Sequence, residues 1–208
     1  MINTSRLRIV IGTLGMVLSA IVLVLSLING YSFPDSISET YYLEPCIAPF
    51  MIILGWASGT LICYGGYELI DDIICSLAGL FGLGICLFPC YSWRDADRIV
   101  GTFQLSMRTS NTIHTTCAMI FFILLAFNSL FLFTKSSGDM TKNKKIRNII
   151  FRVCGIGMIA SFALLLLPIP HVVWVVETVA LIFFGISWLT KANCIPFLFA
   201  DKKENNTK

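Results

Sequence analysis

Long apolar runs separated by short polar segments form the main pattern of the chain. A helix needs about 20 mostly apolar residues to cross the hydrocarbon core of a bilayer. Runs of about this length predict membrane-spanning helices at residues 9–29, 46–67, 73–89, 111–133, 149–167 and 172–190. The pattern therefore predicts an all-α fold, a polytopic membrane protein built as a compact bundle of six transmembrane helices. Residues 1–208 form a single integral membrane domain in this interpretation, with a polar tail at 201–208.

Small residues recur at helical spacing within several of these runs, and such faces allow helices to approach closely. Gly12, Gly15 and Ser19 share a face of the first predicted span, whereas Gly55 and Gly59 form a GxxxG pair in the second. These faces predict helix–helix contacts rather than a particular partner.

Two connections between the predicted spans carry further signals. In the short turn before the third span, Asp71 or Asp72 is expected to cap the helix by accepting hydrogen bonds from its free N–H groups. The connection at residues 90–110 mixes arginines and acids with apolar residues, which predicts a short helix lying in the membrane interface.

Composition and charge support the membrane assignment. The chain is 56% hydrophobic and 13% charged, with a mean hydropathy of +0.81, which excludes an ordinary soluble domain. Six spans place eleven Lys and Arg residues on one side of the membrane and three on the other. Because loops rich in Lys and Arg stay in the cytoplasm, both termini are predicted to be cytoplasmic. The basic residues lie near helix ends, so they indicate orientation and anionic headgroups, and no nucleic-acid partner is expected.

Eight cysteines raise the question of disulfides. Five of them lie within apolar runs and are expected to be small buried residues. Cys46 and Cys90 flank spans on the same predicted side of the membrane, so they are the one pair considered for a bridge. Position alone does not establish the Cα separation that a disulfide requires.

The last predicted span carries a carboxylate, Glu177, well inside one end. An ionisable residue at that depth is costly and therefore points to function. Its partner must come from another helix or from the first or third loop, and the candidates are His114, Arg94, Arg98, Tyr41 and Tyr42. The predicted topology gathers acids and both histidines at the same, non-cytoplasmic end. The candidate ligand-binding residues are Glu39, Tyr42, His114, His171, Trp174 and Glu177.

These polar residues permit acid–base chemistry on an amphiphile or a partial metal site made by His114, His171 and Glu177. No HxxxH or HxxH pair fixes two metal ligands locally, so no metal or other cofactor is favoured. In the alternative interpretation, His171 caps a turn, His114 is an interfacial residue, and Glu177 accepts hydrogen bonds from neighbouring helices. The sequence contains no GxSxG, Walker, HExxH or CxxC motif, so an enzyme is not favoured either.

Four segments carry a family resemblance: SISETYY at 36–42, GYELIDDIICSLAGLFGLGICLFP at 66–89, the pair at 113–114, and ETVALIFFGISWLTK at 177–191. Through them the chain resembles a family of small bacterial six-span membrane proteins of unassigned activity. It is more distantly similar to the damage-regulated autophagy modulator family, and faintly to the alkaline ceramidase and adiponectin-receptor superfamily. The resemblance implies a compact six-helix fold, a first loop that folds back over the bundle, and a place in the bacterial inner membrane.

The ceramidase and adiponectin-receptor superfamily uses three histidines with a serine and an aspartate around zinc. This chain has two histidines, neither in an HxxxH arrangement, so that catalysis is not carried over. Three hypotheses follow. The first is a module that binds a lipid or other amphiphile in an outward-opening cavity within the bundle. The second is a non-enzymatic assembly or regulatory protein that binds other membrane proteins or itself. The third is a proton-linked transporter of small molecules, or a metal-dependent lipid hydrolase.

Overall fold

The computed structural model describes residues 4–66, 68–92, 98–135 and 141–194, so the predicted tail at 201–208 lies outside the described part. The long helices are α1 (Thr4–Ile28), α2 (Glu44–Ile62), α3 (Leu69–Leu87), α4 (Met107–Phe127), α5 (Lys142–Ser161) and α6 (Val172–Lys191). Three short segments accompany them: the 3-10 helix η1 (Ser38–Tyr42), the π-helical turn η2 (Asn128–Leu132) after α4, and the 3-10 helix η3 (Phe162–Leu166) after α5. The six long helices are apolar enough to cross a membrane, which confirms the predicted fold class.

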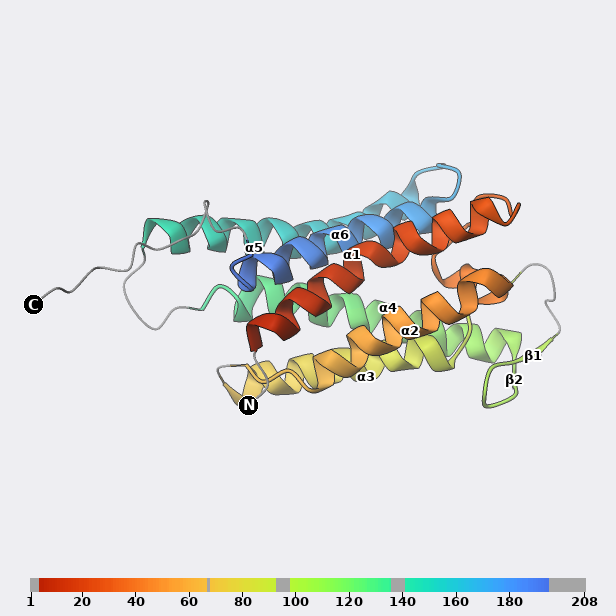
Figure 1. The fold of residues 1–208 in the computed structure, drawn as a ribbon, viewed down its shortest axis with the longest axis horizontal. Coiled ribbons are helices and arrows are strands. Elements are labelled where there is room, and N and C mark those ends of the chain that lie inside the picture. The colour runs from red at the N-terminus through yellow and green to blue at the C-terminus, as the bar shows by residue number, and fades with distance from the viewer. Residues whose placement is uncertain (1–3, 67, 93–97, 136–140, 195–208) are drawn as a thin grey trace, which may run out of the picture.

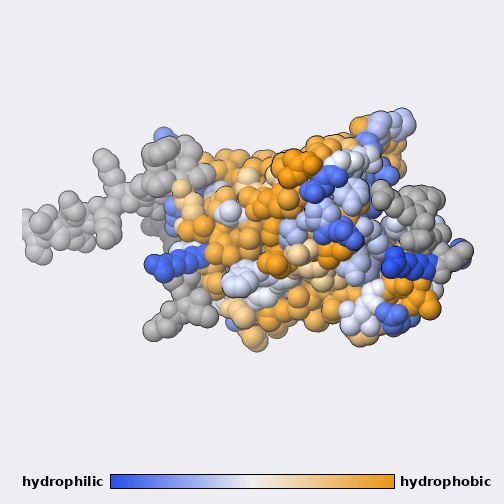
Figure 2. Space-filling view, turned by 45° about the vertical axis from the view of Figure 1, so that its right-hand side comes forward, coloured by the Kyte–Doolittle hydropathy of each residue, from blue (hydrophilic) through white to orange (hydrophobic). Residues whose placement is uncertain are grey.

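The six helices lie side by side in a ring (Figure 1). Each packs against its neighbours in sequence, and α1 also packs against α6. The start of α1 and the end of α6 lie together at one end of the bundle, here called the terminal end. The connections α1–α2, α3–α4 and α5–α6 lie at the opposite end, here called the loop end. On the face drawn in Figure 2, hydrophobic side chains cover the sides and strongly hydrophilic ones gather toward the ends.

Helices α4 and α5 begin earlier than the apolar runs predict. They start at Met107 and Lys142, whereas hydropathy placed the starts at residues 111 and 149. The capping side chains of Ser106 and Thr141 each accept a hydrogen bond of 3.2 Å from the backbone N–H three residues further on. Capping and the good helix propensity of Lys and Arg do not require apolar residues, so a hydropathy pattern misses these polar first turns.

The described part of the connection at 90–110 contains no interfacial helix, which contradicts that prediction there, and residues 93–97 lie outside the described part. This segment contains an antiparallel hairpin of two short strands, β1 (Ile99–Val100) and β2 (Leu105–Ser106). Gly101 turns the chain with a φ of 70°, a backbone conformation that glycine adopts without strain. The hairpin leads directly into α4.

The turn before α3 confirms the capping role expected for an aspartate there. Asp71 accepts a hydrogen bond of 3.3 Å from the backbone N–H of Glu68, which is the residue before the helix. The side chain of Glu68 in turn accepts from the N–H of Asp71, so the two form a reciprocal capping box. Asp72 instead accepts a hydrogen bond of 2.6 Å from the N–H of Gly66.

The two small-residue faces differ in outcome. A Cβ atom added to Gly15 would lie 2.5 Å from the ring of Phe184, so the small face of α1 packs tightly against α6 as expected. The predicted packing through the GxxxG pair of α2 is wrong, because a Cβ atom on Gly55 or Gly59 would meet no atom within 4 Å. The spacing of small residues alone does not say whether their face points at a helix or at lipid.

Polar side chains join four helices inside the bundle. Asn128, fully enclosed in the π-helical turn, donates a hydrogen bond of 2.9 Å to the sulfur of Cys75 on α3. The next residue, Ser129, donates to the carbonyl of Phe151 on α5 at 2.8 Å and lies 2.6 Å from the hydroxyl of Ser187 on α6. Buried polar contacts of this kind fix the relative positions of helices in an apolar environment.

The pair considered for a disulfide is not bridged. Cys46 and Cys90 are both free thiols, and both are buried. The Cys46 thiol instead donates a hydrogen bond of 3.4 Å to the carbonyl of Val22 on α1. A shared side of the membrane therefore does not bring the two sulfur atoms into bonding distance.

Candidate functional site

A cavity of about 700 Å³ lies at the loop end, between α4, the end of α5 with η3, and the start of α6. The first connection and the segment after α3 complete its walls. Helix α4 contacts α5 and α6 more sparsely than it contacts α3, which leaves room for the cavity. Polar side chains line the part nearest the loop end: Ser36, Ser38, Glu39, Asn111, His114 and Glu177. The walls farther from the loop end are apolar: Met119, Phe122, Ile123, Ile159 and Phe162.

The cavity reaches the lipid-facing surface between α4 and α5. Met119, Ile123, Ile159 and Leu165 line it, and each is about half exposed on the outside of the bundle. A side chain that both lines a cavity and faces outward stands at its opening. The opening is therefore lateral, toward the region that lipid occupies around a membrane protein.

Glu177 lies in the second turn of α6 and binds the first connection. Its carboxylate accepts a hydrogen bond of 2.6 Å from the backbone N–H of Ile37 and one of 3.2 Å from the hydroxyl of Ser38. Ile37 and Ser38 are both buried. The intramembrane carboxylate therefore holds the Ser36–Tyr42 segment over the end of the bundle, which is the arrangement that the family resemblance implies.

The prediction that the partner of Glu177 comes from the first loop is confirmed, but the side chains named for this role are not its partners where the structure describes them. Among the described residues, its hydrogen bonds come from a backbone N–H and a serine hydroxyl rather than from a basic or aromatic side chain. The expected partners that the structure describes are His114, Arg98, Tyr41 and Tyr42, and Arg94 lies outside the described residues. Backbone donors carry no sequence signal, so residue type alone could not have found them.

The start of α6 and the first connection hold each other through several contacts. His171 lies 2.7 Å from the carboxylate of Asp35 through its Nδ1 atom. The N–H of Trp174 donates to the backbone carbonyl of Asp35 at 2.9 Å. The ring of Phe33 packs against His171 and Trp174, with centroid distances of 4.8 and 5.4 Å. His171 occupies the cap position with a φ of 54° and makes no side-chain capping bond, so its role is to hold the loop.

The other polar wall is built by the start of α4. His114 Nδ1 donates a hydrogen bond of 2.7 Å to the carbonyl of Phe88, which follows the last residue of α3. Ser110 donates to the carbonyl of Pro89 at 2.8 Å, and Asn111 accepts from the N–H of Tyr91 at 2.8 Å. These three side chains satisfy backbone groups of Phe88, Pro89 and Tyr91, in the segment that follows α3.

Tyr42 connects the first connection to the same segment. Its hydroxyl donates a hydrogen bond of 2.6 Å to the carbonyl of Cys90. Burial raises the pKa of the Tyr42 hydroxyl above its ordinary value, with a further contribution from the negative charges that Cys90 and Tyr41 would carry. Tyr42 therefore stays protonated and acts as a donor that fixes the loop.

The structure divides the six predicted site residues into two sets. Three of them line the cavity: Glu39, His114 and Glu177. The other three hold the segments around its rim: Tyr42, His171 and Trp174. Sequence reasoning did not name Asp35 or Thr115 as site residues, although Asn111, Thr115, Ala118 and Phe122 follow each other at helical spacing and share one face of α4.

The thiol that lines the cavity is not activated. Burial raises the pKa of the Cys90 thiol, and the negative charges of Glu177 and Glu39 raise it further, so Cys90 is a poor nucleophile at neutral pH. Within the described ranges, no three His, Cys, Asp or Glu side chains are grouped so as to hold a metal ion. His114 Nδ1 binds the carbonyl of Phe88, and His171 Nδ1 faces the carboxylate of Asp35.

No protein-family model, curated protein or solved structure matches the chain. The family resemblance drawn from the sequence motifs therefore stays a prediction. The fold and hydropathy define the class on their own: the protein is an integral membrane protein, a bundle of six transmembrane helices. The cavity at its loop end is the candidate functional site.

Proposed function

We propose that the protein binds a lipid or other amphiphile in the cavity between α4, α5 and α6. The main support is that one cavity combines a polar end, formed by Glu39, Asn111, His114 and Glu177, with apolar walls farther from the loop end. An amphiphile has the same division between a polar head and an apolar tail. The volume of about 700 Å³ falls within the roughly 300–1,000 Å³ of typical small-molecule sites.

The lateral opening favours a ligand that arrives from the bilayer. Its mouth is formed by half-exposed apolar side chains, so an apolar tail can enter without crossing a polar surface. Lipid tails are as apolar as the cavity walls, so moving a tail from bilayer to cavity releases little hydrophobic free energy. Selectivity must then come from the head group, which would contact the polar end.

The polar end offers both donors and acceptors to such a head group. Glu39 and Glu177 carry acceptor oxygens, whereas Asn111 and Ser38 carry donors as well. Their side chains are already positioned by hydrogen bonds within the first connection, between that connection and α6, and to the segment after α3. We propose a head group with hydroxyl or amine donors, because the two carboxylates at this end disfavour an anionic head group.

A steric block tests the proposal without removing a polar group. Thr115 lines the cavity and is exposed, so Thr115→Trp fills the cavity while disturbing little of the fold. Thr116 is equally exposed on the same helix and does not line the cavity, so Thr116→Trp is the matched control. The probe is a photoreactive monoacylglycerol added to membranes, because its head group is uncharged and carries hydroxyl donors. Crosslinked residues are located by mass spectrometry of the purified protein.

Crosslinks are expected on the cavity-facing parts of α4, α5 and α6, and Thr115→Trp is expected to reduce them about tenfold or more. The Thr116→Trp protein should crosslink as the unmodified protein does. Equal crosslinking of both variants, or crosslinks spread evenly around the bundle, would refute binding of the amphiphile in this cavity. Native mass spectrometry of lipid retained by each variant gives an independent measurement of the same occupancy.

A further inference from the structure

A second cavity, of about 660 Å³, lies at the terminal end, opposite the lipid cavity proposed above. Five basic residues line it: Arg8, Lys135, Lys144, Arg147 and Lys191. Two acidic residues also line it, Glu68 and Asp71, so its formal charge is +3. The basic residues come from α1, α5, α6 and the segment after α4, so the fold rather than one sequence run brings them together.

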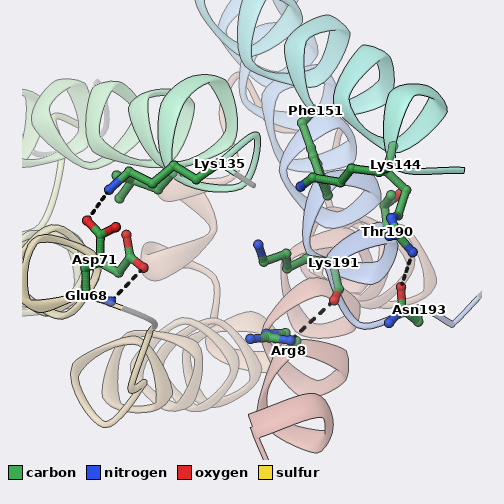
Figure 3. A pocket seen from close by; sticks show the side chains of 11 residues that line it. Arg8, Glu68, Asp71, Lys135, Lys144, Phe151, Thr190, Lys191 and Asn193 are labelled. Carbon is green, nitrogen blue, oxygen red and sulfur yellow. Dashed lines mark hydrogen bonds and ion pairs between the residues drawn. The ribbon is translucent and has the colours of Figure 1, made fainter. Parts of the chain in front are cut away.

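The two acids are engaged on one side of this cavity. Glu68 forms an ion pair of 2.6 Å with Lys135, and Asp71 accepts a hydrogen bond from the N–H of Glu68 in the capping box of α3. Figure 3 shows these three side chains on one side, while the nitrogen ends of Arg8, Lys144 and Lys191 lie along the other. Asp71 also interacts electrostatically with Lys191 of the second group, which comprises Arg8, Lys144 and Lys191. It is therefore the net positive charge of the whole cavity that favours an anion.

That second group is held in place by the surrounding fold. Arg8, which is buried, donates from Nε to the hydroxyl of Tyr64 at 3.0 Å. The ammonium groups of Lys144 and Lys191 both lie 5.9 Å from the centroid of the Phe151 ring. Lys144 also donates to the carbonyl of Phe133 at 3.1 Å. Positive charges gathered in a partly buried space repel one another, and a bound anion offsets that cost.

A polar group with no assigned structural role points into the same space. Thr190 lines the cavity and is fully buried, and its hydroxyl makes no hydrogen bond to any other described residue. A buried hydroxyl without a partner is destabilising, so native proteins usually satisfy it. An anion held by Arg8, Lys144 and Lys191 would accept that hydrogen bond.

We propose that Arg8, Lys144, Thr190 and Lys191 form a binding site for a phosphate group. Phosphate carries up to two negative charges on several acceptor oxygens, which suits three separate cations and a hydroxyl donor. The cavity is larger than one phosphate needs, so it also admits the part of a molecule to which the phosphate is attached. It lies at the start of α1, the end of α6 and the start of α5, at the level where the phosphate groups of lipids lie in a bilayer.

The test is a thermal unfolding titration of the protein purified in detergent. One arm adds inorganic phosphate, with chloride at the same ionic strength as its control. The other arm adds short-chain phosphatidic acid to the micelles, with short-chain phosphatidylcholine as its control. A ligand that binds the folded state raises the unfolding temperature in a concentration-dependent way. A response to the lipid alone assigns the site to a head group, and a response to both assigns it to phosphate in general.

Two adjacent lysines supply a matched pair of variants. Lys144 lines the cavity, whereas Lys145 is exposed on the same helix and does not. Lys144→Gln is expected to raise the half-maximal phosphate concentration about tenfold. A tenfold weaker affinity corresponds to a loss of about 1.4 kcal/mol of binding free energy. Lys145→Gln, with the same loss of charge, should leave it unchanged.

The proposal is overturned if neither form of phosphate raises the unfolding temperature above its control, or if both lysine variants respond alike. Should Lys144→Gln fail to fold, Thr190→Val tests the same site without changing its charge. A several-fold weakening of phosphate binding is expected for Thr190→Val, and unchanged binding refutes the site. The outcome is independent of the lipid cavity, because the two sites share no residue.

Discussion

The hydrogen bonds between Glu177 and the first connection lead to a sharp prediction about stability. Glu177→Ala removes both acceptor oxygens and leaves the Ile37 N–H and the Ser38 hydroxyl without their partner. Glu177→Gln keeps the shape: its amide oxygen can accept from Ile37, and its amide nitrogen can donate to the Ser38 oxygen. The two variants should therefore differ strongly although both lose the negative charge.

The size of the difference follows from the burial of the two donors. A hydrogen bond to a charged group contributes about 1.5–3 kcal/mol, so two of them set an upper range of about 3–6 kcal/mol. Glu177 is only partly buried, so water replaces part of this loss. The quantity of interest is the free energy needed to detach the first connection from α6. We expect Glu177→Ala to lower it by about 2–4 kcal/mol and Glu177→Gln to lower it by less than about 1.5 kcal/mol.

Hydrogen exchange at the Ile37 amide measures this free energy directly. A loss of about 2 kcal/mol should speed exchange of that amide about thirtyfold in Glu177→Ala, while Glu177→Gln should stay within about tenfold of the unmodified protein. Thr178→Val is the neighbouring control, because the Thr178 hydroxyl is buried and bonds to no described residue. Unchanged protection of Ile37 in Glu177→Ala would refute the role assigned to the carboxylate.

Three further predictions follow from the packing, the thiols and the orientation. Gly15→Ala should destabilise the protein by about 1–3 kcal/mol, because its Cβ atom meets a phenylalanine of α6, whereas Gly55→Ala should be neutral or stabilise it by up to about 1 kcal/mol in the same unfolding assay. Maleimide at pH 7 should label exposed Cys63 much faster than Cys90, whose pKa is raised, and equal rates would contradict the burial of Cys90. Lys142→Cys should be labelled from the cytoplasmic side of the membrane, and labelling only from outside would reverse the predicted orientation.

The sequence predicted the six helices well because their signal is local. Each apolar run reports on a single helix crossing a bilayer, and the runs ended within a few residues of most helix ends. The misses at the starts of α4 and α5 have a physical cause. Residues such as Lys142 and Arg147 extend α5 beyond the apolar run, where a helix needs capping rather than hydrophobicity.

The candidate site was predictable only in outline. Topology alone brought Glu39, His114 and Glu177 to the same end, and all three line the cavity. The contacts between segments were not predictable, because the partner of Glu177 is chiefly the backbone of Ile37, which any residue could supply. The basic cavity was missed for a related reason: its lysines, among them Lys144, were counted for orientation, and their convergence depends on how the helices pack.

The lateral opening of the cavity between α4 and α5 determines which concentration of a ligand controls its binding. A molecule that enters past Met119 and Ile159 comes from the bilayer, so its mole fraction among lipids governs occupancy rather than its concentration in water. Diluting vesicles at a fixed ratio of ligand to lipid should then leave the bound fraction unchanged. Adding empty vesicles should lower it, even though the total amount of ligand stays the same.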